Sequence, residues 1–148
     1  MKITLVGSRW FGTETLRRLR ERDVDVARAV VPAADDRLAN AAHDAGIDVY
    51  VLPDHQVVDA GAIVAGTDLI VSAHNHARVS AAALSRSRLG GVGFHPSLLP
   101  RHRGIAAIEW TIKCRDAIAG GTIYHLAERM DAGAIAAQDW CFVKPDES

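Results

Sequence analysis

The sequence predicts an α/β fold built on a mostly parallel β-sheet. Short runs of β-branched and other apolar residues recur along the chain, and most of them end at a glycine, a proline or a polar residue. Segments with apolar residues at helical spacing separate these runs. The runs show no alternation of apolar and polar residues, which is typical of parallel strands that are covered on both faces.

Five strands are expected in the first part of the chain, over residues 2–6, 24–31, 47–52, 68–73 and 91–95. Four helices are expected between them, over residues 11–22, 35–45, 57–65 and 79–84. The second helix has Asp35 or Asp36 near its N-cap and Gly46 just past its end. Strands that alternate with helices form βαβ units, so the sequence predicts the three-layer arrangement of a Rossmann-like fold.

The pattern changes after residue 95. A loop is expected over 98–104, a helix over 105–115, and two strands over 121–127 and 134–143. A short Asp-Ala-Gly turn joins these two strands, so they are expected to form an antiparallel hairpin at the C-terminal end. We expect residues 1–148 to form a single domain, because the chain contains no linker or repeat and has the usual size of one core.

The composition excludes several classes of function. Hydrophobic residues make up 49% of the chain and charged residues 24%, which is typical of a globular protein. The formal net charge is −1, so no overall field attracts a nucleic acid. The sequence shows no signal peptide, and no apolar run reaches the roughly 20 residues of a membrane span. Cys114 and Cys141 have neither metal-type nor disulfide-type spacing, which suits a reducing cytoplasm. Together these observations lead us to expect a cytoplasmic protein that acts on a small molecule.

Candidate functional residues follow the strands, because such sheets bind their ligands at the carboxyl ends of the strands. The first strand leads through Gly7 into Ser8, Arg9 and Trp10. This turn lacks the middle glycine of a dinucleotide-binding motif. Either it holds an anion through Ser8 and free N–H groups at a helix N-terminus, or Gly7 simply allows a tight turn.

The fourth strand is followed by His74, Asn75 and His76. Two histidines two residues apart face the same way on an extended chain, and together with His95 and Asp131 they could bind zinc. The alternative is that these polar side chains line a solvated crevice. Because H-x-H is a weak metal signal by itself, we expect no metal.

The segment HPSLLPRHRG, residues 95–104, is the most informative stretch. Pro96 disfavours a helical conformation at His95, so the imidazole is held at the end of its strand. A histidine at that place can donate or accept a proton near pH 7. Arg101 and Arg103 offer guanidinium groups to an anionic ligand.

HPSLLPRHRG resembles the signature loop of the formyltransferases that use 10-formyltetrahydrofolate. This family includes the glycinamide ribonucleotide, methionyl-tRNA and amino-sugar formyltransferases. The resemblance extends to MKITLVGSRWFG, DLIVSA and GGTIYHLAERMDAGAIAAQ, and so covers nearly the whole chain. It implies the formyltransferase fold, with 10-formyltetrahydrofolate as co-substrate and no metal. It also implies that His95 is the catalytic histidine and Asp131 the catalytic aspartate.

The resemblance further implies two binding regions. The folate is expected along the segment before Asp131 and against the chain near Asn75, with the contact residues His74, His76, Ala77, Leu126, Ala127, Glu128 and Arg129. The amine substrate is expected beside the first strand end and the signature loop, with the contact residues Ser8, Arg9, Trp10, Ser97, Arg101 and Arg103. The chain has no basic stripe for tRNA, so a small amine is expected: an amino sugar, an amino acid or an amine like glycinamide ribonucleotide.

Two features depart from the family pattern. The family has an asparagine two residues before the histidine, where this chain has Gly93, and loss of such an oxyanion donor costs ~10²–10³ in rate. Asn75 is the predicted replacement, with His74 and His76 as further candidates; the alternative is that Asn75 is only a turn residue. A formyltetrahydrofolate hydrolase and a weak or silent folate-binding relative therefore stay open as alternative functions. The chain also stops earlier than family domains usually do, and the apolar surface that this leaves exposed would favour a homodimer.

Overall fold

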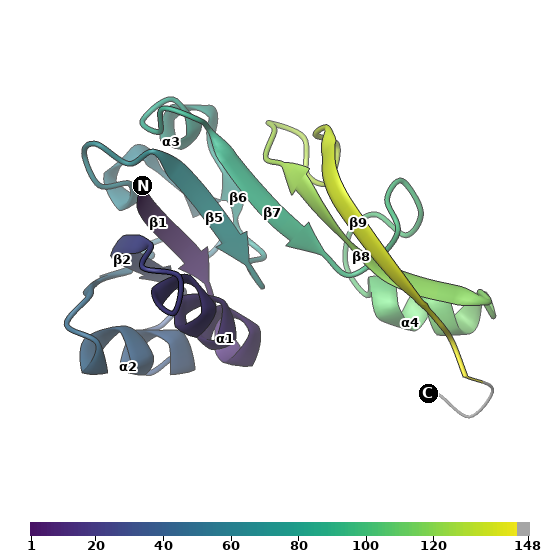
Figure 1. Cartoon of the computed structure of the whole chain (residues 1–148). Helices are drawn as coiled ribbons and strands as arrows, with labels where there is room; N and C mark the ends of the chain where they lie inside the picture. Colours follow the sequence, from purple (N-terminus) through teal and green to yellow (C-terminus); the bar gives the residue numbers. More distant parts are fainter. Residues whose placement is uncertain (145–148) are drawn as a thin grey trace. The chain divides into compact units, whose positions relative to one another are not determined.

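The computed structural model describes residues 1–144 and forms two compact units. The first unit is Met1–Val92, and the second begins at Gly93 (Figure 1). The single domain expected from the sequence stays a prediction. In the described part of the chain, no helix is both long enough and apolar enough to cross a membrane.

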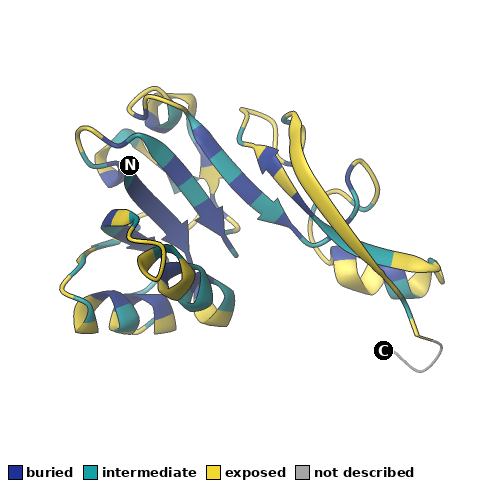
Figure 2. Ribbon diagram, in the orientation of Figure 1, coloured by how far each residue is buried: buried dark blue, intermediate teal, exposed yellow. Residues whose placement is uncertain are grey.

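The first unit contains a parallel sheet in the order β3-β2-β1-β5. Its strands are β1 (Lys2–Gly7), β2 (Asp25–Val31), β3 (Asp48–Val51) and β5 (Leu69–Ala73). The pairs β1–β2, β1–β5 and β2–β3 are all parallel, which confirms the sheet predicted from the apolar runs. Five of the six β1 residues are buried, as a strand covered on both faces requires (Figure 2).

Helices α1 (Arg9–Arg20) and α2 (Arg37–Asp44) pack against this sheet. Asp36 is the N-cap of α2, and its side chain accepts a hydrogen bond of 2.8 Å from the backbone N–H of Leu38. Leu38 is fully buried in the core cluster with Leu5 and Val31. Burying one leucine side chain in this way contributes roughly 1.5–3 kcal/mol.

The prediction of a helix over 57–65 is wrong. Val57–Val58 instead forms the short strand β4, which pairs with β6 (Arg78–Val79), and Ala60–Ala62 is a single 3₁₀ turn. The Asp59 side chain caps this turn by accepting a hydrogen bond of 3.1 Å from the backbone N–H of Ala62. The pairing of β6 also shortens the next expected helix to α3 (Ala81–Leu84).

The second unit contains the predicted hairpin. Strand β7 (Gly91–His95) leads into this unit, and helix α4 (Ala107–Lys113) comes before β8 (Ile118–His125) and β9 (Ile135–Phe142). The last two strands are antiparallel, with Ile118 opposite Phe142 and Tyr124 opposite Ile135. All eight residues of β9 are exposed (Figure 2).

Strand β8 begins at Ile118, three residues before the expected start. The glycines at 120 and 121 are part of the strand, because other groups approach their backbones closely. A Cβ on Gly120 would lie 2.3 Å from the backbone oxygen of Asp139, and one on Gly121 would lie 2.5 Å from the Phe94 ring. These glycines therefore mark close packing and not the edge of a loop.

Candidate active site

His95 is the last residue of β7, and both of its ring nitrogens face other groups of the second unit. Its Nε2 lies 2.8 Å from the backbone oxygen of His102. A carbonyl oxygen only accepts hydrogen bonds, so Nε2 carries the ring hydrogen and donates it. In the neutral imidazole, Nδ1 is then the nitrogen without a hydrogen, and it lies 3.5 Å from Oδ2 of Asp131. The side chain is buried, so this environment fixes both the tautomer and the ring orientation.

Asp131 is buried like His95 and has a positive φ of 52°. Its Oδ2 accepts a hydrogen bond of 2.8 Å from the backbone N–H of Gly104. Its backbone oxygen accepts a bond of 3.1 Å from Nε of Arg103. Two residues later, a Cβ on Gly133 would lie only 1.6 Å from the backbone oxygen of His125, so the Asp-Ala-Gly turn needs glycine there. The signature loop and the hairpin turn therefore hold the carboxylate from two sides.

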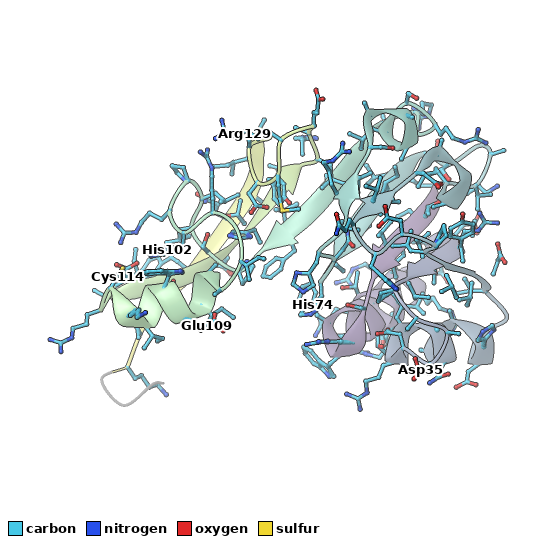
Figure 3. All side chains as sticks on the ribbon, turned by 180° about the vertical axis from the view of Figure 1, so that it is seen from behind. Asp35, His74, His102, Glu109, Cys114 and Arg129 are labelled. Carbon is cyan, nitrogen blue, oxygen red and sulfur yellow. The ribbon has the colours of Figure 1, made fainter. Side chains whose placement is uncertain are left out.

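The loop that carries the His102 oxygen is itself fixed by charged groups. Nε2 of His102 lies 2.7 Å from Oδ2 of Asp116, and Arg101 forms an ion pair with the other carboxylate oxygen. The hydrogen bond with His102, followed by the charge of Arg101, holds the pKa of the Asp116 carboxyl below its usual value. Figure 3 labels His102 in this part of the second unit.

The remaining predicted residues of the second unit fall into two groups. The signature-loop side chains have contacts within the loop and its surroundings: Ser97 Oγ donates a bond of 2.7 Å to the backbone oxygen of Arg101. The segment after β8 is open to solvent, apart from the half-buried Leu126. Its exposed residues are Ala127, Glu128 and Arg129, the last of which is labelled in Figure 3. Their roles in binding the amine and the folate stay predictions.

In the first unit, the structure brings two predicted residues together at the ends of β1 and β5. Ser8 Oγ donates a hydrogen bond of 2.7 Å to the backbone oxygen of His74. This proximity depends on Gly7, where a Cβ would lie 2.3 Å from the backbone oxygen of Ala73. Arg9 and Trp10 start helix α1, and the Trp10 side chain is exposed. The proposed contacts of Ser8, Arg9 and Trp10 with the amine stay predictions.

His74 has a positive φ of 56°, which a non-glycine residue rarely adopts. Its Nε2 is buried and has no hydrogen-bond partner among residues 1–144. The rings of His74 and His76 meet edge to face at 5.3 Å. Desolvation, followed by the charges of His76 and Arg9, lowers the pKa of His74, so the neutral imidazole is favoured.

Asn75 uses its side chain to close its own turn. Nδ2 donates a bond of 2.7 Å to the backbone oxygen of Ala77, and Oδ1 accepts one of 3.0 Å from the backbone N–H of Ala77. These two bonds are the ones expected if Asn75 is a turn residue. One hydrogen of the amide is not used by these bonds, and the role of Asn75 as an oxyanion donor stays a prediction.

Sequence reasoning missed three groups of the site. Two are backbone groups, the His102 oxygen and the Gly104 N–H, which residue types do not reveal. The third is Tyr124 of β8, which is 8% exposed and whose ring lies 3.2 Å from a Cβ built on Gly93; burial, followed by the charge of Asp131, raises its pKa. Its only sequence signal was a phenol within an apolar strand two residues before the folate segment.

No metal arrangement is found in the described residues. Within 1–144 there is no group of three or more histidine, cysteine, aspartate or glutamate side chains placed to hold an ion. Cys114 and Cys141 are both exposed and form no disulfide.

Comparison with known proteins gives a consistent result. A family model described as "Formyl transferase" matches residues 1–148. The chain is 31% identical to the cytosolic 10-formyltetrahydrofolate dehydrogenase of Mus musculus, over 100% of this chain but 18% of the relative. It is 38% identical to the methionyl-tRNA formyltransferase of Akkermansia muciniphila, over 68% of this chain and 33% of that protein. The chain thus spans less than a fifth of the length of the mouse relative.

Solved structures share the fold. The phosphoribosylglycinamide formyltransferase of Bacillus halodurans superposes with a TM-score of 0.83 at 21% identity, over 100% of this chain and 83% of that one. This likeness confirms the α/β class predicted from the sequence, a mostly parallel sheet with antiparallel C-terminal strands.

Proposed function

Because the chain belongs to the formyl transferase family, we propose that it transfers the formyl group of 10-formyltetrahydrofolate to the amino group of a small molecule. A relative named for 10-formyltetrahydrofolate supports the co-substrate, and a relative named methionyl-tRNA formyltransferase supports the transfer. The observation that carries the proposal is the buried pair of His95 and Asp131, whose side chains lie 3.5 Å apart.

The pair is suited to proton transfer. The folate supplies an activated formyl group when bound. His95 keeps its Nε2 hydrogen on the His102 oxygen, which leaves Nδ1 to take the proton of the attacking amine. The Asp131 carboxylate stabilises the imidazolium that forms, and the imidazolium then gives the proton to N10 of the folate as the bond between N10 and the formyl carbon breaks. The separation of 3.5 Å between Nδ1 and Oδ2 is longer than a hydrogen bond, because both atoms are acceptors in the neutral ring; once Nδ1 has taken the proton, it can donate a hydrogen bond to Oδ2.

One observation fits the folate. The buried Nε2 of His74 has no partner among residues 1–144, and a buried polar atom of this kind costs free energy until it is paired. A pterin carries several hydrogen-bonding groups that could pair with it. We propose that the folate contacts His74, His76 and Ala77 and the residues from Leu126 to Arg129, with Asn75 as the oxyanion donor.

A small amine is the proposed acceptor, and Ser8, Arg9, Trp10, Ser97, Arg101 and Arg103 are its proposed contacts. The net charge of −1 gives no general attraction for tRNA, which supports this choice. An amino sugar, an amino acid and an amine like glycinamide ribonucleotide are the candidate classes.

The proposal includes a cytoplasmic homodimer. The unpaired Cys114 and Cys141 fit a reducing compartment. The apolar side chains of Ile135, Trp140 and Phe142 are exposed on β9, and their burial against a second copy would stabilise a dimer. Light scattering of the purified protein measures the mass directly, and a monomer at all concentrations would contradict the dimer.

The function is tested with the purified chain, 10-formyltetrahydrofolate and a panel of small amines. Formation of tetrahydrofolate together with a formylated amine supports the transferase. Formate release at the same rate with and without amines identifies a formyltetrahydrofolate hydrolase. Tight folate binding without turnover identifies a silent folate-binding protein. The matched control is Asp131→Asn, which keeps the size of the side chain and removes its charge.

A further inference from the structure

The signature loop leaves His95 at the end of β7 and returns to the imidazole of the same residue. The backbone N–H of Ser97 donates a hydrogen bond of 2.9 Å to the backbone oxygen of His95, and Oγ of Ser97 donates one of 2.7 Å to the backbone oxygen of Arg101. The backbone oxygen of the next residue, His102, lies 2.8 Å from Nε2 of His95. The orientation of the imidazole therefore depends on the path of residues 96–101.

The hydroxyl of Thr122 binds the middle of this loop. Thr122 belongs to β8 and is fully buried. Its Oγ1 donates a hydrogen bond of 2.6 Å to the backbone oxygen of Ser97 and accepts one of 3.1 Å from the backbone N–H of Leu99. Ser97 and Leu99 are also buried, so their backbone groups depend on this hydroxyl and not on bulk water for these bonds.

Gln138 of β9 fixes the direction of the Thr122 hydroxyl. The two residues lie opposite each other in the antiparallel pair of β8 and β9. Nε2 of Gln138 donates a hydrogen bond of 2.8 Å to Oγ1 of Thr122 and another of 3.0 Å to the backbone oxygen of Leu99. A hydroxyl can donate one hydrogen bond and accept two, and all three are in use here. Because N–H groups take both acceptor sites, the hydroxyl hydrogen points at the Ser97 oxygen.

A glycine of β8 lets the loop lie directly on the strand. A Cβ on Gly120 would lie 2.6 Å from Cδ2 of Leu98, so glycine leaves room for the Leu98 side chain. Leu98 stands between the two loop residues that Thr122 binds. Hydrogen bonds and side-chain packing therefore hold the same short segment, residues 97–99, against β8.

We propose that Thr122, held by Gln138, is a positioning residue for His95: its hydroxyl fixes residues 97–99 and thereby places the His102 oxygen at Nε2 of the imidazole. Thr122 acts through the loop. The part that concerns catalysis rests on the proposed formyl transfer, whereas the placement of the imidazole by Thr122 does not depend on it.

The first test is Thr122→Val, which replaces the hydroxyl by a methyl group of similar size. The loop then loses two hydrogen bonds, which corresponds to a factor of about 10–100, so we expect kcat to fall by that factor while KM for the folate changes little. Thr122→Ser keeps the hydroxyl, and we expect it to restore most of the wild-type kcat. The matched control is Thr111→Val, at a buried threonine of the same unit whose hydroxyl binds the Ala107 oxygen, and we expect it to keep kcat near the wild-type value.

The second test needs no turnover. With nitrogen-15 labelled histidine, NMR follows the Nε2 hydrogen of His95, and its exchange with water reports how firmly the His102 oxygen holds it. We expect exchange in Thr122→Val to be about tenfold faster than in the wild type, and exchange in Thr122→Ser and Thr111→Val to stay close to it.

Three results overturn the proposal. The first is wild-type exchange of the His95 hydrogen in Thr122→Val. The second is a Thr122→Ser variant that behaves like Thr122→Val, because the hydroxyl would then not be the group that positions the loop. The third is an equal loss of kcat in Thr122→Val and Thr111→Val, which a merely structural role of a buried threonine would give.

Gln138→Met decides the question if Thr122→Val does not fold. Methionine keeps roughly the length of the side chain and removes the amide that binds both Thr122 and the Leu99 oxygen. We expect faster exchange of the His95 hydrogen and a kcat lower by about threefold or more. Wild-type values of both quantities in Gln138→Met overturn the proposal.

The proposed function and the inference about Thr122 fail in different ways. If the wild-type protein transfers no formyl group to any amine, the proposed function fails, and the exchange rates still decide the role of Thr122. If turnover is found and the His95 hydrogen exchanges equally fast in the wild type and in Thr122→Val, only the inference about Thr122 fails.

Discussion

Nδ1 of His95 faces Oδ2 of Asp131 at 3.5 Å, while the opposite nitrogen of the same ring is held by the backbone oxygen of His102 at 2.8 Å. The ring is thus oriented by two segments that lie apart in the sequence. Nε2 therefore anchors the ring, while Nδ1 is the nitrogen left for proton transfer. Variants can test these two roles separately.

Replacement of His95 by alanine is expected to lower kcat by ~10²–10⁴, the usual range for loss of a general acid–base residue. His95→Asn is the matched control, because its amide can still donate to the His102 oxygen but cannot take a proton. We expect both variants to lose turnover, with thermal unfolding closer to the wild type for asparagine. Tetrahydrofolate formation measures the rate, and full activity in either variant would contradict the assignment.

Restoration of the family asparagine by Gly93→Asn is expected to fail. The side chain would meet Leu126 and Tyr124 at 2.9 and 3.2 Å, so we expect overpacking that destabilises the fold by ~1–3 kcal/mol without a gain in kcat. Urea unfolding measures the loss.

Gly46→Asn is the control for that experiment. Gly46 has a φ of +69° and no atom within 4 Å of a built Cβ, and asparagine tolerates this backbone conformation. A Gly93→Asn variant as stable as Gly46→Asn would show that the space at position 93 is not filled.

The role of Asn75 is tested by Asn75→Ala and Asn75→Asp. Aspartate keeps an acceptor for the Ala77 N–H but has no amide donor, while alanine has neither. If Asn75 is the oxyanion donor, we expect both variants to lose ~10²–10³ in kcat. Turnover at the wild-type rate in Asn75→Asp, with stability kept, would identify Asn75 as a turn residue only.

Asp116 should make the stability of the second unit depend on pH. Its pKa is lower in the folded protein than its ordinary value of 3.8, chiefly because His102 binds it. A depressed folded pKa gives stability that is present above the unfolded value and is lost as pH falls through the folded one. We therefore expect Asp116→Asn to unfold more easily than the wild type at pH 7, with a difference that shrinks below pH 3.8. A constant difference over that range in thermal unfolding would contradict this account.

The sequence predicted the features that depend on local patterns. Apolar runs located the parallel strands, and the Asp-Ala-Gly turn indicated the hairpin. Asp35 or Asp36 was predicted near the N-cap of the second helix, and Asp36 is the cap. The segment over 57–65 was missed because its strand exists only through pairing with Arg78–Val79, which local residues do not encode.

The residues of the candidate site also divide into those that local sequence patterns indicated and those that they did not. His95 and Asp131 stood out as residue types at a strand end and a turn, and the structure brings them together. The contacts of Gly104 and His102 involve backbone atoms, and that of Tyr124 depends on which strand packs against Gly93. Such contacts arise from tertiary packing. The backbone contacts carry no signal in the order of residues, and Tyr124 carried only that of a phenol within an apolar strand.

The ring of His95 takes its tautomer from a main-chain oxygen, and this has a consequence for protein engineering. Amino-acid replacement cannot remove a backbone carbonyl. Which nitrogen of the His95 ring carries the hydrogen therefore depends on where the backbone places the oxygen of residue 102. Libraries can therefore vary exposed positions of the neighbouring loop to accept new amines. As long as the loop keeps its shape, the same ring nitrogen of His95 carries the hydrogen.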